Sequence, residues 1–284
     1  MTLSVSGDSI TFPDLSTLQT APSGFGFKNR IINGDMRIDQ RNNGAAYLSS
    51  YSGYVLDRYN FAQSPSGKLV AQQNAGAITP PSGFGNYLGF TSQSTYTVTS
   101  GDYYTVEQRV EGFNTFDLAW GTASAQTVIL SFWVRSSITG TFGGAFQNSA
   151  TTRSYPFTYA ISAANTWEQK SITVAGDTSG TWVGASNGIG LNLILGMGVG
   201  SGYSGTAGVW ASANYKGATG ATSVVATSGA TFYLTGVQLE KGSTATAFDY
   251  LDYGCSLIQC QRYYQKYSAD GGTNGLGLAV MWTT

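Results

Sequence analysis

The sequence predicts an all-β protein, and three observations support this expectation. Short runs rich in Thr, Tyr and Val alternate apolar with polar residues, as half-buried strands do. Clusters of Gly, Pro and Asn separate these runs and supply the turns. Helix signals are almost absent before residue 251. We therefore expect one β-sandwich over residues 28–250, preceded by a segment at 1–27 and followed by a helix and the start of a β segment at 251–284.

The expected strands of the sandwich are 30–32, 54–63, 68–74, 86–91, 103–110, 127–136, 141–148, 153–161, 167–174, 191–197 and 231–240. The run 128–134 is apolar on both faces, which indicates a central strand that is covered on two sides. Phe132 and Trp133 in this run are expected in the core. Trp120 and Trp167, at strand edges, are expected to be structural.

The C-terminal region changes character after residue 251. Asp252 is expected to cap a helix over 252–267, with Leu257, Cys260, Tyr264 and Tyr267 on one face. Beyond residue 268 the chain is Gly-rich and then apolar at 276–282. An apolar strand without a partner predicts either that the natural polypeptide continues past Thr284 or that this strand pairs with another subunit.

Composition excludes several classes of function. Charged residues make up 10% of the 284-residue chain, far below the usual quarter, and the net charge is −1. Such a chain offers no basic surface for nucleic acid. A low-charge surface suits contact with neutral sugar or a neighbouring subunit, and it also suits an ordinary Ser/Thr-rich β protein. Cys255 and Cys260 are not expected to form a disulfide. Since neither a signal peptide nor a membrane span is predicted, we expect assembly in a cytoplasm without membrane insertion.

Catalytic chemistry has few candidates. The chain contains no His, which removes Ser-His and Cys-His nucleophiles and the commonest metal ligand. Glu107 and Glu111 on one strand would lie roughly 13 Å apart, too far for a glycosidase pair. We expect them to pair with Arg109 or a neighbouring strand. The Gly-rich run 196–202 lacks the Lys and the helix of a phosphate loop. No enzyme activity and no cofactor are expected, although acids from distant parts of the chain could still meet in space.

Six motifs occur in order along most of the chain. They are NRIINGDMRIDQR at 29–41, VLDRY at 55–59, EQRVEG at 107–112, LSFWVR at 130–135, LTGVQLEKG at 234–242 and CQRYY at 260–264. Together they resemble a family of phage tail and virion proteins. The first, fourth and fifth also resemble the opening, middle and closing strands of jelly-roll carbohydrate-binding modules. The resemblance implies a jelly-roll domain in a fibre, spike or related appendage, usually a homotrimer.

The resemblance also bears on the N-terminal segment and on Asp35. Residues 10–21 resemble an ITFPDGT-QTTA element of phage tail fibres, with Leu15 in place of the usual Gly. This implies that Ile10, Phe12 and Leu18 serve virion attachment or trimer contact, whereas pattern alone would also allow a floppy terminus. The related sugar-binding modules often hold calcium with an Asp of the last strand. Because residues 234–237 lack that Asp, no metal is expected and Asp35 is interpreted as a turn residue.

Sugar binding is the remaining site-level hypothesis. Aromatic faces stack on the C–H faces of pyranoses, while Asn, Gln and Asp bond the hydroxyls. The loop aromatics available for a glycan are Tyr47, Tyr51, Tyr103, Tyr104, Tyr203, Trp210 and Tyr215. The low-complexity stretch 196–229 carries three of them. We expect it to form an arm that leaves the sandwich and either binds a ligand or clasps a neighbouring subunit.

These observations favour a non-enzymatic, homotrimeric phage virion protein, a tail fibre or receptor-binding appendage that attaches to host glycans. Its expected partners are its own copies, other tail proteins through the N-terminal segment, and host surface polysaccharide. The alternatives are a purely structural tail or capsid joint without glycan contact and, less favoured, a polysaccharide-degrading tailspike.

Overall fold

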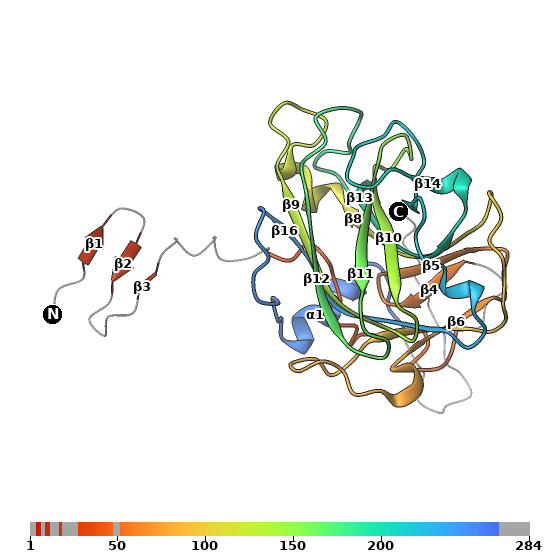
Figure 1. Cartoon of the computed structure of the whole chain (residues 1–284). Coiled ribbons are helices and arrows are strands. Elements are labelled where there is room, and N and C mark those ends of the chain that lie inside the picture. The colour runs from red at the N-terminus through yellow and green to blue at the C-terminus, as the bar shows by residue number, and fades with distance from the viewer. Residues whose placement is uncertain (1–3, 7–8, 12–16, 19–27, 48–51, 267–284) are drawn as a thin grey trace, which may run out of the picture.

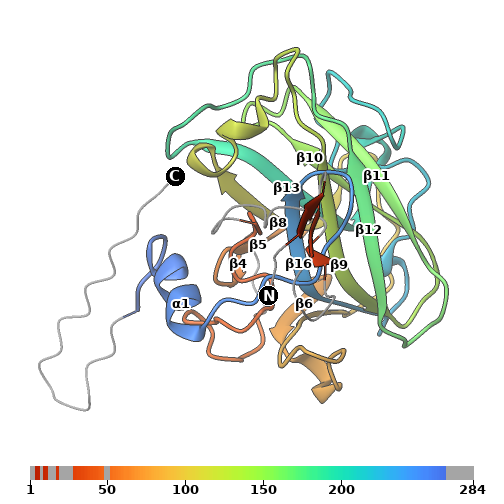
Figure 2. The same cartoon turned by 90° about the vertical axis from the view of Figure 1, so that its left-hand side faces the viewer.

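The computed structural model describes residues 4–6, 9–11, 17–18, 28–47 and 52–266. Two antiparallel sheets face each other in a sandwich (Figures 1 and 2). The six-stranded sheet has the order β11 (Ser154–Ile161), β10 (Gly140–Gln147), β13 (Ile189–Val199), β8 (Tyr103–Glu111), β5 (Tyr59–Ser64), β4 (Gly53–Leu56). The five-stranded sheet has the order β12 (Glu168–Val174), β9 (Val128–Ser136), β16 (Thr231–Lys241), β7 (Leu88–Ser92), β6 (Leu69–Gln73). The expected jelly-roll sandwich is confirmed.

The smaller elements lie outside the two sheets. Strands β1 (Ser4–Ser6), β2 (Ser9–Thr11) and β3 (Thr17–Leu18) form a small antiparallel sheet of their own. Strands β14 (Ser204–Gly205) and β15 (Gly217–Ala218) form a short parallel pair. The 3-10 turns are η1 (Ala75–Ala77), η2 (Gly112–Asn114), η3 (Phe116–Leu118), η4 (Ser201–Tyr203) and η5 (Val224–Ala226). The helix α1 (Tyr253–Gln261) is capped by Asp252, whose side chain accepts from the Cys255 amide as expected. The helix ends at Gln261, so its expected continuation through Tyr264 is wrong.

The core lies between the sheets because alternate residues of each strand point inward. Phe132 of β9 and Phe142 of β10 are completely buried and meet the ring of Tyr159 from the two sides, at centroid distances of 5.0 and 5.9 Å. Burial of each such ring contributes on the order of 2 kcal/mol. The core expectation holds for Phe132. Trp133 points to the opposite face of β9 and stays partly exposed, so its expected core position is wrong.

Two expected strands are also wrong in detail. Residues 30–32 form no strand and lead into a turn at 32–35, because the Asn29 side chain accepts from the Ile31 amide and Asn33 takes a left-handed φ of 59°. The expected strand 54–63 is a hairpin of β4 and β5, broken where Arg58 takes a φ of 73°. Asn often adopts left-handed backbone angles, so a turn at Asn33 has a sequence signal. An Arg rarely adopts them, and nothing in the sequence marks Arg58 as such a position.

The second, third and last motifs of the resemblance contact the first one. Gln108 of the third motif exchanges hydrogen bonds with the backbone of Ile32 at 2.8 and 3.0 Å. The Asn33 side chain donates to the carbonyl of Asp57 in the second motif at 3.0 Å. Cys260 of the last motif is fully buried against Ile32 and Ile38. These motif residues therefore hold the fold together.

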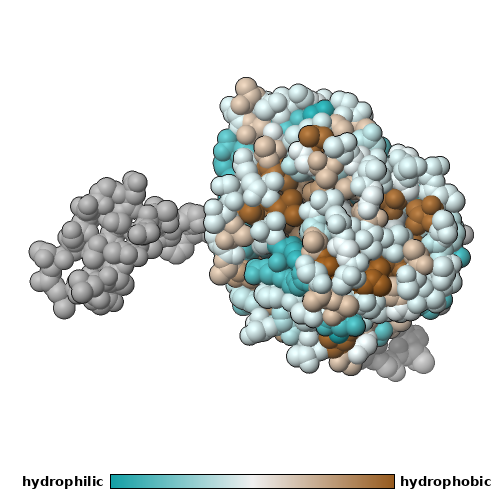
Figure 3. All heavy atoms as spheres, in the orientation of Figure 1, coloured by the Kyte–Doolittle hydropathy of each residue, from teal (hydrophilic) through white to brown (hydrophobic). Residues whose placement is uncertain are grey.

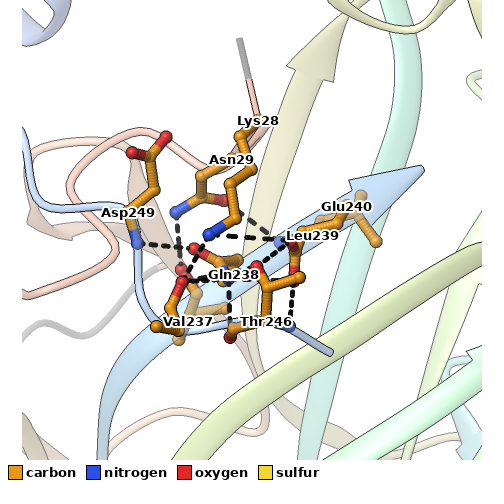
Figure 4. Close-up of polar contacts among 9 residues, drawn as sticks. Lys28, Asn29, Val237, Gln238, Leu239, Glu240, Thr246 and Asp249 are labelled. Atoms are coloured by element: carbon orange, nitrogen blue, oxygen red, sulfur yellow. Dashed lines mark hydrogen bonds and ion pairs between the residues drawn. The ribbon is translucent and has the colours of Figure 1, made fainter. Parts of the chain in front are cut away.

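The chain is fastened to β16 where residue 28 enters the sandwich (Figure 4). The Asn29 side chain donates to the Val237 carbonyl and accepts from the Leu239 amide, both at 3.1 Å. Glu240 accepts from the Thr246 amide and hydroxyl, and its carboxylate lies 3.9 Å from Nζ of Lys28. These contacts join both ends of the sandwich sequence to its central strand β16.

The low-complexity arm folds back onto the sandwich, so the expectation that it leaves the sandwich is wrong. Ser154 donates to the Ala213 carbonyl at 2.7 Å, and Gln147 donates to the Tyr215 carbonyl at 2.8 Å. Under the arm, Ala145 and Ile194 on the outer face of the six-stranded sheet are fully buried. Residues 200–221 therefore cover part of this outer face.

Candidate functional site

The structure scatters the aromatic residues that the sequence nominated. Tyr103 and Tyr203 meet edge to face at 5.4 Å where the arm lies on β8. Tyr215 lies farther along the arm, beside Ser154 of β11. Tyr47 packs against the core next to β6. Tyr104 is completely buried between the sheets, so the expectation that it is open to a ligand is wrong.

Four other nominated residues yield no site geometry. Tyr51 and Phe12 lie outside the described residues. The backbone of Ile10 belongs to β2 and that of Leu18 to β3, and these two residues are partners in the register of the small sheet. Their role in attachment or trimer contact stays a prediction.

Trp210 lies in a cluster of three tryptophans at one end of the sandwich, which we name the tryptophan end. Trp120, Trp182 and Trp210 come from three separate loops. Their rings contact one another edge to face at centroid distances of 4.8, 5.3 and 5.5 Å and angles of 77–83°. Tyr155 of β11 adds a fourth ring, 5.1 Å from Trp210. Aromatic pairs in this geometry stabilise each other beyond simple burial.

Hydrogen bonds fix the orientation of each indole. Nε1 of Trp120 donates to the Gln126 carbonyl at 2.8 Å, and Nε1 of Trp210 donates to the Ala175 carbonyl at 2.8 Å. Nε1 of Trp182 donates to the carboxylate of Asp177 at 3.2 Å. Asp177 is itself 1% exposed and bonded by Arg153 at 2.7 Å. The rings are therefore preorganised, which lowers the entropic cost of binding a ligand to them.

A hollow of about 50 Å³ opens beside Trp120 and Trp182. Next to this hollow, η2 packs closely against the segment at Gly184, because a Cβ on Gly112 would lie 2.0 Å from the Gly184 carbonyl oxygen. Two phenylalanines of this end project to solvent, Phe113 at 49% and Phe116 at 57% exposure. In contrast, the face of the molecule in Figure 3 is mostly pale and shows apolar residues only in separate spots.

Neither glutamate of β8 pairs with Arg109, but Glu107 accepts from Asn192 of the neighbouring strand β13 at 3.1 Å, as the second expectation had it. Glu107 pairs with Lys216 of the arm at 2.9 Å, and Glu111 pairs with Arg262 after α1 at 3.0 Å. Burial opposes the charge of Glu107, but Lys216 and hydrogen bonds from Lys216, Asn192 and Thr105 hold its pKa below the usual value. A lowered pKa keeps Glu107 charged, which does not suit a general acid.

Two acids from distant parts of the chain do meet in one hollow. Asp35 and Asp249 line it together with Arg37, and burial raises the pKa of Asp35. The hollow holds about 20 Å³, room for a water molecule and not for a sugar ring. Burial also raises the pKa of Asp57, which is 1% exposed and accepts a hydrogen bond from Gln40.

Within the described residues, no group of three or more His, Cys, Asp or Glu side chains could hold a metal. No helix among them has the length and apolar composition of a membrane span.

Comparison with known proteins bears on the fold. No family model and no curated protein matches this sequence. Among solved structures, the enzymatically active domain of tailspike protein 4 of bacteriophage CBA120 is similar at 10% identity and a TM-score of 0.40, over 75% of this chain and 21% of that one. The chain thus spans about a fifth of the length of that tailspike chain.

Carbohydrate-binding modules are similar over their whole length. TmCBM61, solved in complex with β-1,4-galactotriose, matches at 8% identity and a TM-score of 0.37, over 76% of this chain and 99% of the module. The family 11 module of a Clostridium thermocellum cellulosomal cellulase matches at 11% identity and a TM-score of 0.31, over 70% of this chain and all of the module. At these identities the likeness concerns the β-sandwich fold alone.

Sequence reasoning missed Trp182, Phe113 and Phe116. Trp182 and Phe113 lie close to glycines in irregular segments, whereas no such local signal marks Phe116. The structural position expected for Trp120 is consistent with its 8% exposure.

Proposed function

We propose that this chain is a phage virion protein, a tail fibre or receptor-binding appendage, that attaches to the host surface by binding glycans at the tryptophan end. The observation that carries the proposal is the set of three hydrogen-bonded tryptophans beside an open hollow. Oriented rings with polar neighbours suit the apolar faces and hydroxyls of a sugar. The six motifs of the resemblance support a place in the virion.

The proposed protein is a non-enzymatic homotrimer that assembles in the host cytoplasm and joins other tail proteins through residues 1–27. Light scattering on the purified full-length chain tests the assembly, with three times the mass of the chain as the expected result. A monomer at all concentrations would contradict it.

Binding of the full chain to a glycan array and to whole host cells tests the proposed site. Trp182→Ala and Phe116→Ala should each weaken binding about tenfold or more, because exposed aromatic anchors dominate such contacts. Trp167→Ala is the matched control. Trp167 is also half-buried and hydrogen-bonded, to the Thr79 carbonyl at 2.9 Å, but it belongs to the Tyr87–Tyr233 cluster. Equal losses in all three variants would contradict a site at the tryptophan end.

A purely structural joint is the second candidate, favoured by the exposed side chains of Phe113, Phe116 and Val209 at the same end. Exposed apolar clusters also mark contacts between proteins. Firm binding of this end to another virion protein, without binding to glycans or host cells, would favour the joint. Release of reducing sugar from host polysaccharide would instead support a depolymerase.

A further inference from the structure

Arg58 is a buried cation without a carboxylate partner among the described residues. The residue is 8% exposed, and its guanidinium stacks on the Tyr263 ring at 3.4 Å. One nitrogen donates to the Arg109 carbonyl, whereas Nε has no hydrogen-bond partner in the described part of the chain. Burial lowers the pKa of this guanidinium. A buried charge is costly unless an opposite charge compensates it.

A second arginine lies beside it on the outer face of the six-stranded sheet. Asn60 of β5 pairs with Glu107 of β8, and the same antiparallel register places Arg58 opposite Arg109. The Arg109 side chain is half-buried and has neither an ion pair nor a hydrogen bond among the described residues. Neither guanidinium group forms an ion pair among the described residues, although the charge of Glu111 acts on Arg58.

Both arginines line a hollow of about 10 Å³, room for a single oxygen-sized atom. Tyr54, Asn187 and Tyr263 also line it, and the Asn187 side chain makes no hydrogen bond to another described residue. The one carboxylate at the hollow, Glu111, is engaged by Arg262 at 3.0 Å. Three guanidinium groups thus face one carboxylate here, in a chain whose net charge is −1.

The hollow adjoins the tryptophan end. Residues 183–190 form the partition, since Val183 and Gly184 line the larger hollow and Asn187 and Ile189 line the smaller one. The backbone of this partition is fixed to η2, because the Phe113 amide donates to the Ser186 carbonyl at 2.9 Å. The two hollows therefore lie on either side of the segment 183–190.

We propose that Arg58, Arg109 and Asn187 bind the carboxylate of an acidic sugar, so that the glycan recognised at the tryptophan end is a uronic-acid-type polysaccharide. This inference rests on the proposed function. The guanidinium groups donate to the carboxylate oxygens, as arginine does in its strongest hydrogen bonds, and Asn187 supplies an amide donor. The neutral sugar next to it lies against the tryptophan rings.

The experiment compares uronic-acid-containing polysaccharides with the same preparations after reduction of their carboxyl groups to alcohols. The full chain should bind the acidic forms about ten- to a hundredfold more tightly, the range for a charge-assisted hydrogen bond. Arg109→Gln and Asn187→Ala should reduce the ratio of the affinities for the acidic and reduced forms. Arg109→Lys should retain part of this preference. Neither Arg109 nor Asn187 has a side-chain partner to lose, so these variants test the site even where Arg58→Gln fails to fold.

Arg135→Gln is the matched control, because Arg135 lies on β9 of the other sheet and donates to the Asn165 carbonyl. This variant should keep the full preference. Free sodium glucuronate should compete with the polysaccharide better than glucose or inorganic phosphate does.

Equal affinity of the natural chain for acidic and reduced forms would overturn the inference, as would an unchanged preference in Arg109→Gln and Asn187→Ala, or phosphate competing as well as glucuronate. Trp182→Ala separates the two proposals. If that variant loses the reduced glycans while the natural chain shows no preference for acid, only this inference fails. If the natural chain binds no glycan, both fail.

Discussion

Nζ of Lys216 lies 2.9 Å from Oε1 of Glu107, although 109 positions separate the two residues in the chain. Glu107 is 3% exposed on β8, and Asn192 and Thr105 also donate to its carboxylate at 3.1 and 2.9 Å. Lys216 belongs to the arm at 200–221. This ion pair therefore fastens a Gly-rich segment to the sheet beneath it.

Replacing Lys216 alone should destabilise the fold more than replacing Lys216 and Glu107 together. Lys216→Met leaves the Glu107 carboxylate buried without its counter-charge, so we expect the free energy of unfolding to fall by about 3 kcal/mol. Urea titration followed by tryptophan fluorescence measures the change. The double variant Glu107→Gln/Lys216→Met should recover much of the loss. A single variant as stable as the natural chain would show that the pair adds nothing.

Acid should loosen the arm before it unfolds the sandwich. The folded pKa of Glu107 lies below its usual value, so the stabilisation is complete above the unfolded pKa and is lost as pH falls through the folded one. Because unfolded Glu titrates near pH 4.3, we expect amide hydrogen exchange over 200–221 to rise below about pH 4 relative to β9 and β16. In Glu107→Gln that pH dependence should disappear. An unchanged dependence would point to another carboxylate.

The glycine of the first motif should be irreplaceable for a steric reason. A Cβ on Gly34 would lie 2.1 Å from the carbonyl oxygen of Val237, a backbone atom that cannot move alone. We expect Gly34→Ala to lower the free energy of unfolding by roughly 2 kcal/mol or more, as overpacking does. Gly85→Ala, where a Cβ meets nothing within 4 Å, should be close to neutral. Thermal melts of the two variants give the comparison.

Both the oxygen and the nitrogen of the Asn29 side-chain amide should contribute to the stability of the fold. Asn29→Ala leaves the Val237 carbonyl and the Leu239 amide without this partner, which we expect to cost about 1–3 kcal/mol. Asn29→Asp keeps the acceptor for the Leu239 amide and loses the donor to Val237. Chemical denaturation should therefore rank the chains with Asp between Asn and Ala. Identical stability for all three would mean that Asn29 does not anchor β16.

Alternation of apolar and polar residues was enough to predict most strands of the sandwich. It also placed both ends of β16 to within one residue. It failed where the backbone turns on a residue with no turn signal, as at Arg58, and where a strand is exposed on one face, as at Trp133. Both outcomes depend on neighbours from other strands, and a local pattern does not contain them.

The site was less predictable for the same reason. The low-complexity stretch 196–229 pointed to Trp210, but the tryptophan end forms only when Trp120, Trp182 and Trp210 arrive from three loops. The arm has no periodicity, so nothing local showed that Lys216 would reach Glu107. The hollow at Arg58 and Arg109 is lined by residues from several separate segments, which no single strand reveals.

The anchorage of Asn29 and Arg30 to β16 has a mechanical consequence. Asn29 bonds to Val237 and Leu239, and the Arg30 amide donates to the Leu239 carbonyl at 3.0 Å. A pull along the N-terminal segment therefore reaches the middle strand of the five-stranded sheet first, where hydrogen-bonded neighbours on both sides share the load. A force applied to the N-terminal segment is therefore shared by several strands of the five-stranded sheet before an edge strand separates.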